Sequence, residues 1–426
     1  MKYAYKNGKI LNGHIDMAIE EGKIILVDGQ KIEKIVGNDA DLSGYTVIDL
    51  AGKYIMPGLI NMHVHVPAGG KTSMKQSDNT KLVKLMTSCG LMKSILTMMC
   101  KSYAKTELMS GVTTFRAVGG VQDFDGKIRD LINEGKFDGP RMLVANAAVS
   151  VPGGHMAGSL AYEAMSAEDA ANWVNKIADT KPDLIKLMIT GGVLDAKKKG
   201  EPGEMKMPPE YIKAACEAAH KRGLMVAAHV ESPEGVKAAL EGGVDTIEHG
   251  ARLTDELVEL FKKTGSKIIA TLSPAVPFAF FSQEETGLSE LDAYNGKFLF
   301  EAEIDCYKRA IEEGIPLGLG TDVGCPFVTH YDTWRELAYF VKFLDVSPEF
   351  ALYTATLKNA QIAGIDNITG SIDEGKDADF VVTEKNPLED MRALANISMV
   401  VSRGKVYDHP QLKKKAKVEE QLNPLM

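Results

Sequence analysis

The sequence predicts an α/β protein: a (β/α)8 (TIM) barrel accompanied by a small β-sandwich built from both chain termini. Three observations support this fold. Short apolar runs alternate with helical segments from residue 58 to about residue 364, both flanks consist of short strands joined by glycine turns, and no low-complexity linker separates these parts. We therefore expect a barrel domain at residues 58–365 and a composite β-sandwich domain at residues 1–57 and 366–426.

Eight apolar runs are the candidate barrel strands. Each is short and apolar, several with Val, Ile or Thr, as is typical of strands that are buried on both faces of a parallel sheet. The runs are LINMHVHV (59–66), GVTTFRAV (111–118), RMLVANAAVS (141–150), DLIKLMIT (183–190), LMVAAHV (224–230), DTIEHG (245–250), KIIATLSPA (267–275) and IPLGLGTD (315–322). In such a barrel, functional side chains are expected where the strands end.

Helix start and stop signals lie between the runs. Residues 166–179 begin with Ser166 and have a carboxylate three residues later, a pattern typical of a helix N-terminus. Residues 208–223 have proline at the start and glycine at the end, which is the asymmetry that helices favour. Residues 232–243 and 254–265 end in glycine in the same way.

The flanks follow a different pattern. Residues 2–57 contain NGKILNG, IEEGKIILVDG and KIEKIVG, which are short strands between glycine turns. Residues 370–408 resume this pattern with GSIDEGKDADFVVTEKNP and VVSRGKVYD. We expect the two pieces to pair into one β-sandwich, and the charged last residues, LKKKAKVEEQLNPLM, to form a helix or a loose tail.

The composition favours a cytoplasmic protein. The net charge of −9 argues against nucleic-acid binding, which rests on phosphate neutralisation by Lys and Arg. The five cysteines are scattered and form no CxxC pair, as expected of free thiols in a reducing compartment. The N-terminus lacks the apolar core of a signal peptide. The most apolar stretch, Leu91 to Cys100, is too short to span a bilayer and is expected to be the Met-rich face of a buried helix. We expect no membrane partner and a homo-oligomeric assembly.

Two histidines end the first run, in the order His63-Val64-His65. Residues two apart in a strand point to the same face, so both imidazoles are expected to face the barrel axis. Neutral imidazole is a common ligand of zinc. The alternative is that they are two unrelated core histidines.

Three further residues that can bind a metal end later runs: His229, His249 and Asp322. Together with the first pair they place four imidazoles and one carboxylate on one face of the predicted barrel. This set offers nitrogen and oxygen ligands for two cations and leaves open positions for water and substrate.

The motifs PGLINMHVHV, DLIKLMITGGV, AAHV, DTIEHG and LGTD together resemble the amidohydrolase superfamily, and within it the prolidase-like and imidazolonepropionase-related peptidases. The resemblance covers the whole chain, including the split β-sandwich. Each motif is weak singly and specific as part of the set.

One lysine, Lys186, lies inside the apolar run 183–190. Burying an unpaired ammonium group is costly, so one interpretation is a lysine at a strand edge or one paired with a carboxylate. The resemblance implies instead that its amine takes up CO2 and that the resulting carbamate bridges two metal ions. Imidazolonepropionases and mononuclear deaminases lack this lysine, so Lys186 favours the binuclear, prolidase-like branch.

The resemblance also assigns the metal ligands. His63, His65 and Asp322 would hold a buried ion and His229 and His249 a more exposed one, with Lys186 between them. Zinc is the expected metal. The two cations would lower the pKa of a bridging water toward neutrality, and the resulting hydroxide would be the nucleophile. Asp322 is the expected catalytic residue, which accepts the proton of the water and then gives it to the leaving amine.

Substrate contacts are expected from two histidines. His155 lies in SVPGGHM, which matches a GGH element that contacts substrate in the prolidase-like family; the alternative is a loop histidine packed under the two glycines. His330 follows the last run and also matches a family position. Arg116 matches the family's TTxRD element, but the aspartate of that element is Ala117 here, which puts the role of the arginine in doubt.

Glu231 is a third candidate substrate contact and departs from the family pattern. Prolidase-like relatives often carry a tyrosine two residues after the histidine of the fifth strand, where it helps bind the α-carboxylate of the substrate. A glutamate at this position repels a carboxylate and prefers a cation or an amide hydrogen. The alternative is that Glu231 caps the helix that starts at Pro233 or points away. Cleavage before proline therefore does not follow from the resemblance.

We predict a binuclear metal-dependent amidohydrolase that hydrolyses an amide bond in a dipeptide or N-acyl amino acid and so acts on a small, dipeptide-like substrate. The first alternative is a cyclic amidase or a deaminase of the same superfamily. The second is a catalytically inactive, metal-free scaffold of the same fold, against which the retention of all six ligand positions argues.

Overall fold

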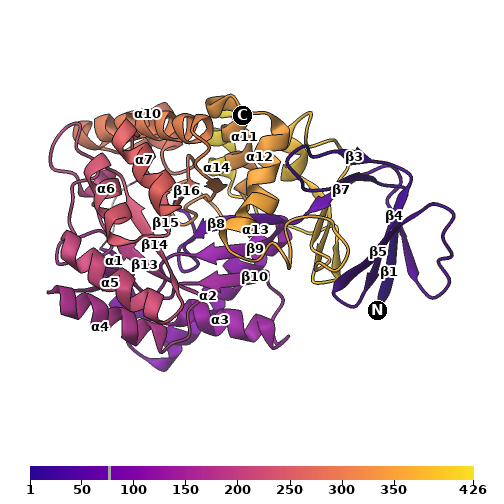
Figure 1. The fold of residues 1–426 in the computed structure, drawn as a ribbon, viewed down its shortest axis with the longest axis horizontal. Coiled ribbons are helices and arrows are strands. Elements are labelled where there is room, and N and C mark those ends of the chain that lie inside the picture. The colour runs from indigo at the N-terminus through magenta and orange to yellow at the C-terminus, as the bar shows by residue number, and fades with distance from the viewer. Residues whose placement is uncertain (75–77) are drawn as a thin grey trace. The chain divides into compact units, whose positions relative to one another are not determined.

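The computed structural model of the protein describes residues 1–74 and 78–426 (Figure 1). These residues form two compact units. The first comprises Met1–Asn61, Ala104–Phe115 and His330–Met426, and the second comprises Met62–Tyr103 and Arg116–Thr329. The domain boundaries expected after residues 57 and 365 stay a prediction.

A seven-stranded sheet occupies the second unit, in the order β12-β11-β13-β14-β15-β16-β17. All six neighbouring pairs are parallel. Its central strands are almost entirely buried, as their apolar sequences predict. The strands are β11 (Ala148–Ser150), β12 (Ala161–Glu163), β13 (Leu184–Met188), β14 (Met225–Val230), β15 (Thr246–His249), β16 (Lys267–Ala270) and β17 (Leu317–Leu319).

A three-stranded sheet has the order β10-β9-β8. Its strands are β8 (Leu59–Val64), β9 (Val112–Ala117) and β10 (Arg141–Val144). Backbone hydrogen bonds join this sheet to the larger one near β17, at one end, and near β13. The amide of Asp322, just beyond β17, donates to the carbonyl of His63 at 2.9 Å, and the amide of Asp183, just before β13, donates to the carbonyl of Val144 at 2.8 Å.

The predicted alternation of parallel strands and helices is confirmed, with one difference in the third run. Residues 141–150 form two strands, β10 and β11, because the chain turns at Asn146, whose φ of 60° lies in the left-handed region. The side-chain oxygen of Asn146 accepts a hydrogen bond from the amide of Gly126 at 2.9 Å, which holds this turn. The sequence showed neither the break nor the additional strand β12.

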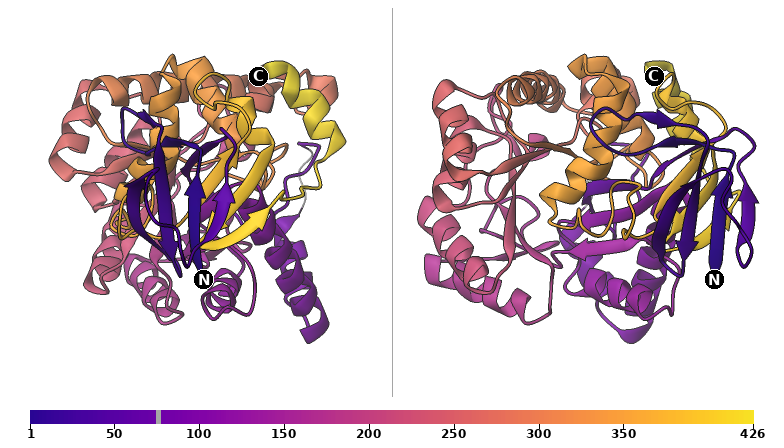
Figure 2. Two further views of the ribbon diagram at one scale, coloured as in Figure 1. Left: turned by 90° about the vertical axis from the view of Figure 1, so that its right-hand side faces the viewer. Right: turned by 45° about the vertical axis from the view of Figure 1, so that its right-hand side comes forward.

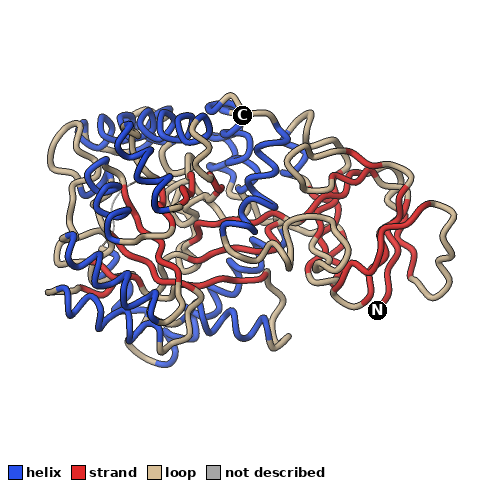
Figure 3. Tube along the Cα trace, viewed as in Figure 1, coloured by secondary structure: helices blue, strands red, loops and turns tan. Residues whose placement is uncertain are grey.

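The four helices expected from capping signals are present. Ser166 and Ser232 accept hydrogen bonds from the third residue of α4 (Ala167–Ala178) and α6 (Pro233–Gly242). Helix α7 (Asp255–Thr264) begins after Thr254, and α5 (Pro209–Lys221) begins at the expected proline. Figure 3 shows the helices of this unit on the outer side of its strands. The remaining helices before residue 330 are α1 (Asn79–Met86), α2 (Gly90–Met109), α3 (Phe124–Asn133), α8 (Val276–Phe280), α9 (Gln283–Thr286) and α10 (Glu290–Glu312).

The apolar stretch Leu91–Cys100 lies in α2 and corrects one expectation. The helix is not buried all round: Leu91 is 71% exposed and Met98 is 65% exposed, while Leu96 and Cys100 are buried. Residues about four apart in a helix lie on the same face. Only the stripe of α2 that contains Leu96 and Cys100 is therefore buried. In the described parts of the chain, no single helix is long and apolar enough to cross a membrane. Helices α1 and α2, which meet at a bend of 111°, reach that length and apolar composition only when they are counted together.

The first unit contains two sheets from the chain termini, in the orders β5-β4-β1-β6 and β20-β19-β18-β7-β2-β3. The expected pairing of the termini is present, because β18 runs antiparallel to β7. Figure 2 shows the N-terminal strands in indigo beside the C-terminal strands in yellow. The strands are β1 (Lys2–Lys6), β2 (Lys9–Leu11), β3 (Ile19–Glu20), β4 (Lys23–Asp28), β5 (Lys31–Gly37), β6 (Thr46–Asp49), β7 (Tyr54–Pro57), β18 (Phe380–Thr383), β19 (Ile397–Ser402) and β20 (Lys405–Asp408).

One hydrophobic core lies between these two sheets. Tyr5 and Ile25 come from the four-stranded sheet, and Ile55 and Phe380 come from the six-stranded sheet. The rings of Tyr5 and Phe380 meet edge to face, with centroids 5.6 Å apart. The same unit contains α11 (Thr333–Leu344), α12 (Pro348–Tyr353), a π-helical turn (Thr354–Lys358), α13 (Asn359–Ile362) and, in the charged tail, α14 (Ala416–Leu422).

We expect Phe380→Ala to destabilise the first unit, because the buried ring fills the core that both terminal sheets share. Truncation of a buried phenylalanine typically lowers the free energy of unfolding by about 3–5 kcal/mol. Urea unfolding would measure the change. The control is Val47→Ala on β6, whose side chain is 43% exposed and whose loss is expected to cost less than about 0.5 kcal/mol. Equal effects of the two substitutions would contradict a core at Phe380.

Candidate active site

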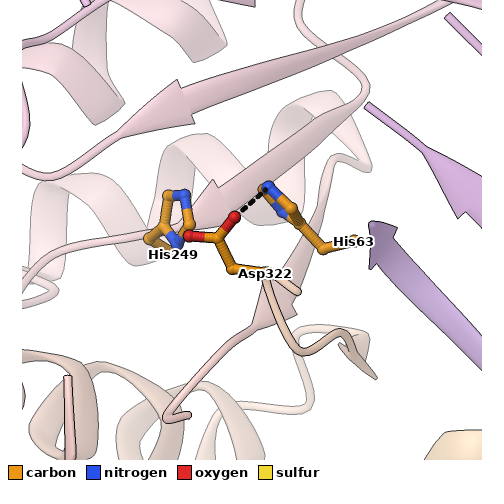
Figure 4. Close-up of side chains that lie close together, drawn as sticks. All are labelled: His63, His249 and Asp322. Carbon is orange, nitrogen blue, oxygen red and sulfur yellow. Dashed lines mark ion pairs between the residues drawn. The ribbon is translucent and has the colours of Figure 1, made fainter. Parts of the chain in front are cut away.

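The five histidine and aspartate side chains expected to bind metal lie together in the second unit. Asp322 Oδ1 is 3.4 Å from His63 Nε2 and 3.1 Å from His65 Nε2. The ring of His249 is centred 4.8 Å from the rings of both His63 and His229. Ligand atoms of His63, His249 and Asp322 all lie within 4.8 Å of one another, as Figure 4 shows. The predicted strand-end cluster is therefore present.

Two members of this cluster have an unusual backbone. His249 ends β15 with a φ of 66°, and Asp322 follows β17 with a φ of 54°. Left-handed conformations are uncommon outside glycine and are found preferentially at functional sites, where the surrounding structure enforces them. At His249 this turn breaks the alternation of the strand, so that both Glu248 and His249 can contact His63.

A carboxylate that the sequence analysis missed orients His63. Glu248 Oε2 accepts a hydrogen bond from His63 Nδ1 at 2.8 Å, and Glu248 Oε1 accepts one from Arg116 Nη2 at 2.6 Å. Arg116 also donates to the carbonyl of Met62 and to the hydroxyl of Thr246. Burial raises the pKa of Glu248, but the charge of Arg116 and the bond from His63 outweigh burial and hold this pKa well below its usual value. Arg116, whose role was in doubt, thus pairs with the residue that positions His63.

The imidazole of His63 is a neutral acceptor at its other nitrogen. Burial and the charge of Lys186 lower the pKa of His63 from 6.5 to about 4, so that the ring is uncharged at neutral pH. Because Nδ1 donates to Glu248, the lone pair of Nε2 points toward Asp322. His65 Nδ1 likewise donates, to the carbonyl of Gly119 at 2.8 Å. The Nε2 atoms of both rings face the carboxylate of Asp322.

Lys186 is fully buried in β13, and its Nζ has no hydrogen-bond partner among the described residues. This burial excludes the interpretation of Lys186 as an exposed lysine at a strand edge. Burial lowers its pKa from 10.5 to about 8, and the charges of Glu248 and Asp322 limit the shift. A larger fraction of the amine is therefore uncharged near neutral pH than for an ordinary lysine. An uncharged amine is the form that can react with CO2.

Glu231 points into the cluster. Ser232, not Glu231, caps α6, so the capping alternative is wrong. Glu231 Oε1 is 3.9 Å from His229 Nε2, and ligand atoms of Glu231, His229 and His249 all lie within 4.8 Å of one another. Burial and the neighbouring charges of Asp322 and Asp195 raise the pKa of Glu231 well above its usual value.

His155 lies against the cluster, as expected for a residue near substrate. Its ring stacks on that of His229, with centroids 4.2 Å apart and an interplanar angle of 5°. His155 Nδ1 is 2.7 Å from Asp195 Oδ2, which also accepts a hydrogen bond from the amide of Gly192. Asp195 ends a short 3₁₀ helix, Val193–Asp195, in a loop that no sequence signal linked to His155. The contact between His155 and substrate stays a prediction.

His330 belongs to the first unit, where it is buried. Its Nδ1 lies 3.0 Å from Oε1 of Glu107, and burial raises the pKa of that carboxyl group. The predicted role of His330 in substrate binding stays a prediction.

A thiol contacts the expected catalytic aspartate. Cys325 Sγ donates to Asp322 Oδ2 at 3.1 Å, and burial raises the pKa of this thiol well above its usual value. All five cysteines are free in the structure, as their spacing predicts. The position of Cys325 near Asp322 follows from a turn after β17 that the sequence did not show.

The comparisons with known proteins identify the family. Residues 54–407 match the amidohydrolase family. The crystal structure of a Bifidobacterium longum protein provisionally assigned as a prolidase has a TM-score of 0.87 and 34% identity, covering 99% of this chain and 98% of that one. That of a Xaa-Pro dipeptidase with bound methionine has a TM-score of 0.84 and 28% identity, covering 96% of this chain and 100% of the other. Ochratoxinase of Aspergillus niger is 27% identical over 421 residues, or 90% of this chain and 83% of the relative.

These matches confirm the resemblance noted in the sequence and favour an enzyme over a metal-free scaffold. They extend over nearly the whole chain, so the terminal strands are part of the likeness. The chain belongs to the amidohydrolase family and is a hydrolase that acts on carbon–nitrogen bonds.

Proposed function

We propose that the protein is a binuclear metal-dependent amidohydrolase that hydrolyses an amide bond in a dipeptide or an N-acyl amino acid. The observation that carries the proposal is the set of acceptors that face one another at the strand ends. His63 Nε2 and His65 Nε2 both face the same carboxylate of Asp322, and a cation bound between them would be coordinated by all three groups. The relatives described as prolidase and Xaa-Pro dipeptidase support a peptide-like substrate.

The residues present fit two divalent cations. The family generally binds such ions, and two groups of ligand atoms share His249: one with His63 and Asp322, the other with His229 and Glu231. We infer that His63, His65 and Asp322 hold one ion, that His229 and His249 hold the other, and that a carbamate on Lys186 lies between them. Zinc suits this set of nitrogen and oxygen ligands. The buried, unpartnered Nζ of Lys186 supports the carbamate.

The two bound cations would lower the pKa of an attacking water and polarise the scissile carbonyl group. Asp322 would accept the proton of this water on a carboxylate oxygen and deliver it to the leaving amine. Cys325 would hold the second oxygen of Asp322 through its thiol hydrogen bond. Glu248 and Arg116 would keep His63 in the tautomer that is unprotonated at Nε2. His155 and His330 remain the proposed substrate contacts.

The fold proposal follows the same family. We infer that the seven-stranded parallel sheet and the three-stranded sheet form one (β/α)8 barrel at residues 58–365, supported by the backbone hydrogen bonds that link them. We also infer that residues 1–57 and 366–426 form a composite β-sandwich around the core of Tyr5 and Phe380. A cyclic amidase or a deaminase of the same superfamily is the alternative activity. A cytoplasmic location and a homo-oligomeric assembly are likewise proposals.

We expect the purified wild-type protein to contain close to two divalent cations per chain, and Lys186→Met to contain one or fewer. Methionine resembles lysine in length but cannot form a carbamate, so the bridge between the ions would be lost. Elemental analysis by mass spectrometry would count the metals. The control is Lys206→Met, because Lys206 pairs with Glu204 and is not among the proposed ligands. One tightly held ion or none in fully loaded wild-type protein would contradict the binuclear centre.

We expect Asp322→Asn to lower kcat by about 10²–10⁴-fold, since positioned acid–base groups contribute that much. Metal content would be measured on the same samples because Asp322 is also a proposed ligand. Cys325→Ala is the matched control: it removes the hydrogen bond to Asp322 but keeps the carboxylate, and we expect a loss below about tenfold. Asp322→Asn with full metal and near-normal kcat would leave the reaction without its proposed base.

We expect a screen of dipeptides and N-acyl amino acids to detect release of a free amino acid that depends on bound metal. The physical reason is that the cluster is built to polarise an amide carbonyl and to protonate an amine. Amino-acid analysis of the products would identify the cleaved bond. Ring opening of cyclic amides or release of ammonia, without activity on linear amides, would favour the alternative activities.

A further inference from the structure

We propose that Glu231 is a ligand of the second cation, beside His229 and His249. This inference rests on the proposed function, because it assumes a binuclear centre. The sequence alone suggested a contact between Glu231 and a positively charged group of the substrate. A metal ion and such a group offer the same positive charge to a carboxylate, and the structure favours the metal ion.

The position of the carboxylate carries the first part of the argument. Glu231 follows directly after β14, and its side chain turns back toward the strand end that carries His229. Its Oε1 atom is 3.9 Å from His229 Nε2. Zinc binds nitrogen and oxygen ligands at about 2.0–2.2 Å, so two ligands of one ion lie at most ~4.4 Å apart. The measured separation is therefore compatible with one ion bound between these two atoms.

His249 completes the group. Ligand atoms of Glu231, His229 and His249 all lie within 4.8 Å of one another, so a small adjustment of the side chains brings all three to one ion. A metal ion would contact all three residues at once.

The burial of Glu231 carries the second part. Its Oε2 atom is buried and has no hydrogen-bond partner among the residues that the structure describes. A buried polar atom without a partner is unfavourable, and a cation bound beside Glu231 would supply that partner.

The backbone around Glu231 holds this arrangement in place. The amide of Glu231 donates to the hydroxyl of Thr190 at 3.0 Å. Gly203 lies so close that a Cβ atom there would be 2.3 Å from the carbonyl carbon of Glu231. The carboxylate is not needed for the following helix either, because Ser232 provides the cap of α6.

Zinc retention tests the proposal without reference to substrate. The wild-type protein, Glu231→Gln and Glu256→Gln would be loaded with zinc and challenged with increasing concentrations of a chelator, with bound zinc counted at each step. We expect Glu231→Gln to weaken the affinity for one of the two ions by at least ~10-fold and to leave the other unchanged, because even indirect partners of metal ligands contribute that much. Glu256→Gln is the matched control, since its exposed carboxylate pairs with Lys237 outside the site, and we expect wild-type affinities.

A second variant and a second readout keep the outcomes distinct. Glu231→Asp keeps the charge on a shorter side chain, and we expect a smaller loss of affinity in the same direction even if the glutamine variant does not fold. Wild-type zinc affinities in both Glu231 variants would overturn the proposal. If these variants then lost turnover of basic substrates but not of neutral ones, Glu231 would belong to the substrate site. A wild-type protein that holds fewer than two zinc ions would refute the binuclear function itself, whatever the variants do.

Discussion

The candidate site depends on the hydrogen bonds that the buried carboxylate of Glu248 accepts. This carboxylate accepts hydrogen bonds from His63 on β8 and Arg116 on β9, although Glu248 itself lies on β15, far away in the sequence. Removing one partner of a buried charge pair typically costs about 3–5 kcal/mol, because the other charge is left uncompensated. The three strands are therefore held in one register by charge as well as by packing. The same contact fixes the tautomer of His63 and so directs its unprotonated Nε2 toward Asp322.

From this arrangement the rest of the cluster follows. His63 Nε2 faces Asp322, and Asp322 also faces His65, so three side chains converge on one point. His249 and Asp322 reach this point only through left-handed turns at the ends of their strands. Such backbone conformations cost on the order of 1–3 kcal/mol and persist where the surrounding structure enforces them. The strand ends are thus built around the centre of the cluster.

Much of this could be predicted from the sequence, because regular elements leave periodic signals. The apolar runs and helix caps located the strands and helices, and the position of His63, His65, His229, His249 and Asp322 at run ends was enough to place them together. Lys186 was identifiable because a lysine inside an apolar strand is unusual.

The contacts that the sequence did not show arise where the chain leaves a regular element. Glu248 was hidden because strand alternation places it opposite His249, and only the left-handed turn at His249 lets both residues reach His63. Asp195 is on an irregular loop whose path no periodicity describes, and it was not linked to His155 for that reason. The break at Asn146 inside the third run has the same origin, since a single residue with positive φ leaves no trace in hydrophobicity.

Two buried polar groups lie in the cluster that, on the proposed function, binds cations. Lys186 Nζ and Glu231 Oε2 have no hydrogen-bond partners among the described residues, yet the structure surrounds both with protein. They are not paired with each other, so neither charge compensates the other. A ligand that binds only the folded chain stabilises it by about 2.7 kcal/mol when the free ligand concentration is about a hundred times its dissociation constant. Bound cations would therefore act on the stability of the folded chain as well as on the reaction, because they would remove the penalty of these unpartnered groups. On the proposed function, the strand ends would give up some intrinsic stability to assemble a site that bound cations complete.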